Sequence, residues 1–145
     1  MSTKLQYISD TELCFRNKKD VTITFSKDQI AGMTVKINNL MFVMSADQFD
    51  LFQNAFNLDD FHQFNFRMKT SYEDQTYNLD DTIGYKVTLD FHPVHDLGDD
   101  NLLNDSLAIK MIRVNDYGYT EKAKIKLTIE QFEILKNFVG KNDEN

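Results

Sequence analysis

Hydrophobic and polar residues alternate along the first third of the chain, with the period of two that is typical of strands with one buried face. Val21, Ile23 and Phe25 alternate with threonine or serine, and the alternation returns over 33–37. The asparagine pair at 38–39 favours a tight hairpin, because asparagine tolerates a left-handed backbone. The pattern predicts four strands in this part, at about 13–16, 21–26, 33–37 and 40–44.

The alternation continues in the second half of the chain, with longer connections between its segments. Phe64, Phe66 and Met68 alternate with polar residues, which again indicates a strand with one buried face. The pattern predicts four further strands, at about 64–68, 85–91, 107–114 and 123–127, with a hairpin turn at 116–118.

A helix start follows each set of predicted strands. Ser45 and Thr128 are good N-cap residues, and Gln48 and Gln131 stand three positions after them, which completes two capping boxes. Hydrophobic residues recur at helical spacing after both caps, as in a helix that buries one face. They are Phe49, Phe52 and Phe56 in the first segment and Phe132, Leu135, Phe138 and Val139 in the second. Both segments are therefore predicted to be helices.

Two units of strands followed by a helix predict an α+β fold. We expect a tandem pseudo-twofold repeat of an antiparallel β-sheet unit followed by one helix, ββββα twice, sharing one core. A chain of 145 residues suits one domain. Residues 1–145 are therefore predicted to form a single domain made of two repeats, at about 10–57 and 61–140. One continuous antiparallel sheet carrying both helices on one side is the alternative.

Charge and cysteine content bear on location and partners. The formal net charge of −7 disfavours nucleic-acid binding by bulk electrostatics. The acidity is local, since residues 58–105 hold eleven Asp or Glu against three Lys or Arg, so a basic face elsewhere is compatible with it. Cys14 is the single cysteine and is expected to be buried. No segment resembles a signal peptide or a membrane helix, which predicts a cytoplasmic protein with no membrane partner.

Two histidines and a carboxylate crowd the end of a predicted strand, in the segment Phe91-His92-Pro93-Val94-His95-Asp96. Imidazole and carboxylate groups could hold zinc or a similar ion, which makes His92, His95 and Asp96 candidate ligands. His62 is the remaining histidine that could complete a site. Solvated histidines in a loop at the strand end are the alternative interpretation, and neither a metal nor another cofactor is predicted.

Lysines occupy every second position of the last predicted strand. Cations beside exposed aromatic rings could follow a phosphate backbone while the rings stack on bases. The same lysines could instead protect an exposed strand edge from aggregation. The candidate nucleic-acid-binding residues are Lys110, Arg113, Tyr117, Tyr119, Lys122, Lys124 and Lys126.

No motif of a catalytic or phosphate-binding loop occurs in the chain. The leading expectation is a non-enzymatic protein-interaction module, a binding or adaptor protein whose partner is an unidentified protein or a second copy of the chain. The first alternative is single-stranded nucleic-acid binding through the lysines, arginine and tyrosines named above, although the net charge disfavours it. The second is a metal-dependent hydrolase at the His-Pro-Val-His-Asp segment.

Overall fold

The structure is a computed structural model that describes residues 4–28, 32–58, 61–75, 82–97 and 103–140. Its first part comprises β1 (Lys4–Ile8), β2 (Glu12–Arg16), β3 (Thr22–Lys27), β4 (Met33–Ile37), β5 (Leu40–Val43) and α1 (Ala46–Leu58). Its second part comprises the 3₁₀ helix η1 (Phe61–Gln63), β6 (Phe66–Gln75), β7 (Thr82–Leu97), β8 (Leu103–Asn115), β9 (Thr120–Thr128) and α2 (Ile129–Val139).

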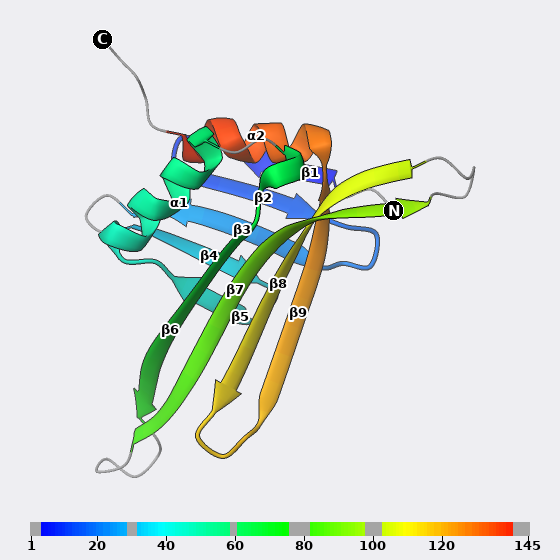
Figure 1. Cartoon of the computed structure of the whole chain (residues 1–145). Coiled ribbons are helices and arrows are strands. Elements are labelled where there is room, and N and C mark those ends of the chain that lie inside the picture. The colour runs from blue at the N-terminus through cyan, green and yellow to red at the C-terminus, as the bar shows by residue number, and fades with distance from the viewer. Residues whose placement is uncertain (1–3, 29–31, 59–60, 76–81, 98–102, 141–145) are drawn as a thin grey trace.

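The strands form two antiparallel sheets, each in chain order, β1-β2-β3-β4-β5 and β6-β7-β8-β9. The predicted α+β class with antiparallel strands is confirmed, whereas the alternative of one continuous sheet is wrong. Figure 1 shows that the strands of the two sheets run in different directions and that β6 to β9 reach well beyond the first sheet.

The prediction of four strands in the first part is wrong by one, because β1 adds a fifth. All five of its side chains are exposed, so the segment lacks the alternation that burial imposes on a strand. It is a strand through its pairing with β2, which includes a register shift between Leu5 and Tyr7. A strand that pairs with its neighbour in the chain but buries neither face leaves no alternation of hydrophobic and polar residues in the sequence.

The segment 92–96, which lies after the end of the predicted strand 85–91, belongs to β7 and continues its pairing with β8. Pro93 made a strand unlikely in the sequence, because proline cannot donate a ladder hydrogen bond. The ladder between β6 and β7, however, starts at the pair Phe66 and Phe91. Pro93 therefore lies beyond the ladder with β6, in a part of β7 that is paired with β8 alone. This part of β7 is an edge of the sheet, where proline is tolerated.

Both predicted capping boxes are confirmed. The Ser45 hydroxyl accepts a hydrogen bond from the Gln48 amide at 3.1 Å, and the Gln48 side chain accepts one from the Ser45 amide at 2.9 Å. Thr128 and Gln131 make the same pair of bonds at 3.1 and 2.8 Å. Each box satisfies backbone donors that the first helical turn would otherwise leave unpaired, and so defines where α1 and α2 begin.

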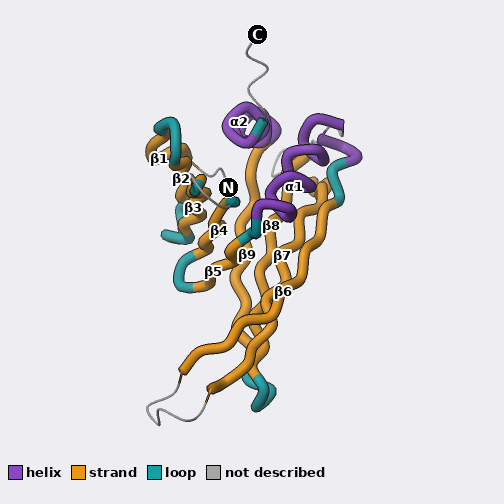
Figure 2. The backbone as a smooth tube through the Cα atoms, turned by 90° about the vertical axis from the view of Figure 1, so that its left-hand side faces the viewer, coloured by secondary structure: helices purple, strands orange, loops and turns teal. Residues whose placement is uncertain are grey.

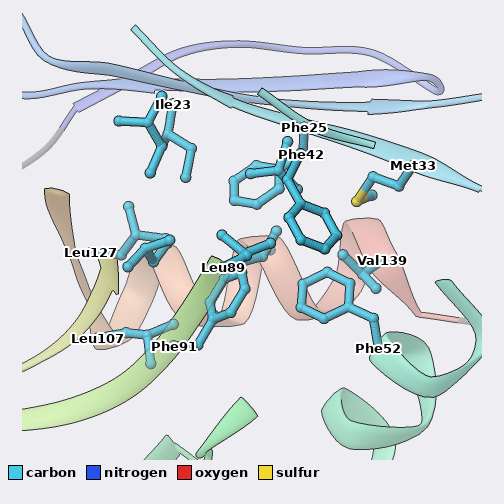
Figure 3. Packing of buried hydrophobic residues seen from close by; sticks show 14 of the residues in the cluster. Ile23, Phe25, Met33, Phe42, Phe52, Leu89, Phe91, Leu107, Leu127 and Val139 are labelled. Atoms are coloured by element: carbon cyan, nitrogen blue, oxygen red, sulfur yellow. The ribbon is translucent and has the colours of Figure 1, made fainter. Parts of the chain in front are cut away.

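One cluster of buried hydrophobic residues draws on both sheets and both helices. In Figure 3, Phe42 of the first sheet faces Leu89 and Phe91 of the second. Phe52 of α1 completes the contact, with its ring centroid 5.1 Å from that of Phe91 and 5.3 Å from that of Phe66. Burial of these large rings contributes to the cohesion between the two sheets.

The two helices lie at the same end of the molecule (Figure 2) and contact each other directly. The ring of Phe132 in α2 lies 5.4 Å from those of Phe56 and Phe64. The Gln53 side-chain amide of α1 donates to the Val139 carbonyl at 3.0 Å and so satisfies an acceptor at the end of α2.

Tyr72 joins the sheets at the far edge of the first one. Its hydroxyl donates to the Val43 carbonyl of β5 and accepts from the Val43 amide, both at 2.8 Å. Burial raises the pKa of Tyr72 above its ordinary value, with smaller opposing contributions from hydrogen bonds to Val43 and Thr70. The neutral phenol thus gives the Val43 amide and carbonyl, on the edge strand β5, hydrogen-bond partners of the kind that a neighbouring strand would supply.

Tyr72→Phe is expected to lower the free energy of unfolding by about 1–2 kcal/mol, because it removes two hydrogen bonds and leaves Val43 without these partners. Urea denaturation at neutral pH measures this. Above about pH 10 the wild-type protein should also lose stability, since Tyr72 ionises more readily in the unfolded chain. The variant should lack that component. Tyr117→Phe, at a side chain that is 73% exposed, is the matched control. Equal losses in the two variants would contradict the role of Tyr72.

Candidate nucleic-acid interface

The register of the four-stranded sheet assigns each of its side chains to one of two faces. The ladders between β6 and β7, β7 and β8, and β8 and β9 show no register shift over the paired residues. Directly paired residues point to the same side, and neighbours along a strand point to opposite sides. One face holds Leu89, Phe91, Ile109 and Ile125 and packs in the core. The other is the outer face.

Seven cationic side chains lie on the outer face, and we call this set the basic face. Six of them are exposed and Lys110 is half-buried. Their positions follow from the pairing of each strand with its neighbours. The basic face consists of Arg67 and Lys69 on β6, Lys86 on β7, Lys110 on β8, and Lys122, Lys124 and Lys126 on β9.

Three of the cations, Arg67, Lys110 and Lys124, lie in one row across the sheet. Lys110 is directly opposite Lys124, and Asp90 on β7 is paired with both Lys110 and Arg67. Directly opposed like charges on one sheet face destabilise a sheet. The pairing of two lysines on neighbouring strands therefore concentrates positive charge at a cost in stability.

Carboxylates do little to balance this charge. Among the outer-face side chains that the structure describes, the carboxylates are Glu73, opposite Gly84, and Asp90. Asp90 is itself engaged, with an oxygen 3.2 Å from Nδ1 of His92. Leaving Lys126 aside, no cation of the basic face has a salt bridge to a described carboxylate.

Protection of exposed edges accounts for only part of the basic face. The lysines of β9 and the cations of β6 are on the edge strands of this sheet, where lysine prevents the addition of further strands. Lys86 and Lys110 lie on the interior strands β7 and β8, which are paired on both sides. Interior lysines contribute nothing to edge protection, and they extend the positive charge to the two interior strands.

Arg113 does not join the predicted lysine row. It is paired with Val87 and Glu121, and it lies on the same face as the core residues. Its guanidinium carbon is 3.9 Å from the centroid of the Tyr85 ring, a cation–π contact. The prediction that placed Arg113 beside Lys110 missed this because residues three apart in a strand point to opposite faces.

Tyr117 and Tyr119 lie in the turn between β8 and β9, as predicted, and are 73% and 74% exposed. The side-chain oxygen of Asn115 accepts hydrogen bonds from the amides of both tyrosines, at 2.9 and 3.0 Å. Gly118 has a φ of +88°, which its lack of a side chain permits. The turn is thus well defined, and it presents two aromatic rings at the end of the sheet.

The structure does not bring the candidate ligands His92 and His95 together. His92 is on the outer face beside Asp90, whereas His95 is on the opposite face, paired with Asp105. The backbone of Asp96 lies in β7, and its side chain is outside the described part of the structure. His95 has His62 and Asp105 as neighbours instead.

Arg67, Lys69 and Lys86 belong to the basic face but were absent from the sequence-based candidates. Each alternates with hydrophobic residues, so their exposure was evident from the sequence. The sequence does not give the strand register, which places these three residues on the same face as the β9 lysines.

Comparisons with known proteins add nothing to these observations. No family model, curated protein or solved structure matches the chain. Within the residues that the structure describes, neither helix is sufficiently long and apolar to cross a membrane.

Lys124→Glu is expected to raise the free energy of unfolding by about 0.2–1 kcal/mol, because it replaces a directly opposed like-charge pair with Lys110 by an attractive one. Thermal or urea denaturation at low salt measures the gain, which should shrink as salt screens the charges. Lys36→Glu on β4 is the matched control, since it changes the net charge equally but is paired with Thr24 and Met41. A loss of stability in both variants would contradict the inferred repulsion.

Proposed function

We propose that this protein is a non-enzymatic module that binds single-stranded nucleic acid through the basic face. The observation that carries the proposal is the run of seven cations over all four strands of one sheet face, including the interior strands β7 and β8. The function rests on the sheet as a whole, and the β9 lysines predicted from the sequence are one edge of it.

The spacing of the cations suits a polymer of phosphates. Alternate residues of a strand lie about 6.8 Å apart, so Lys122, Lys124 and Lys126 form an evenly spaced row. Lysine and arginine bind phosphate oxygens and release condensed counterions, which supplies sequence-independent affinity. The side chains of Lys110 and Lys124, which repel each other in the free protein, would share the negative charge of the same strand.

The acidic net charge is compatible with this proposal because the charges are separated in space. The outer face carries the seven cations of the basic face against Glu73 and Asp90 among its described side chains, although the whole chain has a net charge of −7. At physiological salt the screening length is about 8 Å, so a bound strand senses mainly the face that it contacts. Acidic groups elsewhere reduce non-specific association more than binding at this face.

A single strand suits the surface better than a duplex. The long strands of this sheet twist along their length in Figure 1, and a flexible single strand can follow a twisted row of charges. Tyr117 and Tyr119 offer exposed rings at the end of the sheet, on which unpaired bases can stack. A duplex keeps its bases stacked internally and would leave these rings unused.

Titration of a fluorescent single-stranded oligonucleotide at several salt concentrations tests the proposal. The double substitution Lys122→Glu with Lys124→Glu should weaken binding at least about tenfold, because it removes two phosphate contacts and adds repulsion. The slope of log affinity against log salt should fall by about 1.4, at about 0.7 for each lost phosphate contact.

The matched control reverses two lysines in the turn between β2 and β3, Lys18→Glu with Lys19→Glu. Both side chains are exposed, lie outside the basic face and give the same change in net charge. This variant should bind nearly as the wild type does. Absence of binding by the wild-type protein at low salt, or equal losses in the two double variants, would overturn the proposal.

A second experiment separates base stacking from general attraction to phosphates. Tyr117→Ala with Tyr119→Ala should weaken oligonucleotide binding at least about fivefold, since stacking contributes about 1–3 kcal/mol for each base. Binding of inorganic polyphosphate, which has no bases, should be unchanged when both ligands are titrated by competition. An unchanged affinity for the oligonucleotide would contradict stacking on these rings.

A protein interface, the leading expectation from the sequence, stays a prediction. The observation nearest to it is β1, an edge strand on which Leu5, Tyr7 and Ile8 are exposed. Exposed apolar side chains on an unpaired edge are suited to pairing with a strand of another protein or a second copy. The cytoplasmic location also stays a prediction.

The finer architecture that we propose is an internal duplication within a single domain. Both sheets lead into a helix through a Ser/Thr and Gln capping box, and one buried cluster includes residues of both units. The five and four strands of the two sheets would then reflect divergence of the two repeats, with β1 as an addition to the first.

A further inference from the structure

Three side chains that could ligate a metal converge beside the core, away from the basic face. They are His62 of η1, His95 of β7 and Asp105 of β8, and one donor atom of each lies within 4.8 Å of the others. Nδ1 of His95 is 2.6 Å from one Asp105 oxygen, and Nδ1 of His62 is 3.9 Å from the other. The two imidazole rings are stacked, with centroids 5.7 Å apart.

The backbone holds these three residues in place. His95 and Asp105 are direct partners in the ladder between β7 and β8, so their Cβ atoms are about 4.5–5.5 Å apart. His62 is adjacent to Phe61, which is buried and packs edge-on against Phe132 of α2 at 5.5 Å between centroids. Packing of one neighbour and the pairing of two strands therefore bring the three groups together.

The donor set has the chemistry of a transition-metal site. Two imidazoles and one carboxylate are common ligands of zinc, whose bonds to nitrogen and oxygen are about 2.0–2.2 Å long. Ligand atoms around a tetrahedral ion are then about 3.3–3.5 Å apart, so the separations here, all within 4.8 Å, need to close by at most about 1.5 Å. Rotation of exposed side chains can supply this, since His62 and His95 are 58% and 51% exposed.

A hydrogen-bonded pair of His95 and Asp105 accounts for only two of the three groups. His62 is stacked on the ring of His95 and extends towards the second oxygen of Asp105, at a distance too long for a hydrogen bond. One carboxylate thus has an imidazole near each of its oxygens. An ion that replaces the proton between His95 and Asp105 would use all three groups at once.

We propose that His62, His95 and Asp105 form a binding site for a divalent transition-metal ion of the zinc class. The ion ties η1, which follows α1, to the ribbon of β7 and β8, and its remaining coordination positions face solvent. The site lies on the opposite side of the sheet from His92 and the cations of the basic face. It is independent of the proposed nucleic-acid binding.

Titration calorimetry with zinc chloride, on protein prepared without a histidine tag, tests the site. We expect one zinc ion per chain and an increase in Tm on addition of zinc, since binding favours the folded state. His62→Gln, His95→Gln and Asp105→Asn should each weaken zinc binding at least about tenfold, a loss typical even of residues that only support a ligand. Cobalt(II) should give a visible absorption band that the same variants lose.

His92→Gln is the matched control, because it removes a histidine from the same strand but from the other face. It should keep the stoichiometry, the affinity and the zinc-dependent increase in Tm. The proposal is overturned if the wild type binds no stoichiometric zinc. It is equally overturned if the three site variants bind as the wild type does, or if His92→Gln weakens binding as much as they do.

Discussion

The unbroken antiparallel register of β6 to β9 determines which side chains enter the core and which form the outer surface of the second sheet. Because neighbours along a strand alternate, a single register places Leu89, Ile109 and Ile125 inside and Lys110 and Lys124 outside. A shift of one residue would exchange these two sets and bury the lysines. The hydrophobic core therefore holds the basic face in position, and neither can change without the other.

The direct pairing of Lys110 with Lys124 on the outer face costs stability. Lys110 and Lys124 are direct partners, and a sheet optimised for folding alone would place opposite charges there. The cohesion of the core tolerates this cost, since the rings of Phe52, Phe66 and Phe91 pack together where α1 meets the sheet. The inner face of the sheet thus supplies the stability, and the outer face carries a like-charge pair that lowers it.

Much of the local structure was predictable because it depends on neighbours in the sequence. The capping boxes at Ser45 and Thr128 and the left-handed residue Asn38 at its hairpin all depend on residues a few positions apart. The strand β1 and the continuation of β7 through Pro93 were missed because neither has the alternation that a buried face gives to a sequence. Each owes its conformation to pairing with another strand, which local patterns do not record.

The sequence by itself determined where the helices begin and which residues of each strand are hydrophobic, since periodicity and capping act over a single helical turn or strand. Only the tertiary structure decided that Lys86 and Lys110 share a face with Lys124, that Arg113 stacks on Tyr85 instead, and that His95 meets His62 rather than His92. The physical reason is that these groupings depend on register and on contacts between distant segments. Burial of the whole hydrophobic core selects the register and these contacts, whereas a short stretch of sequence specifies neither.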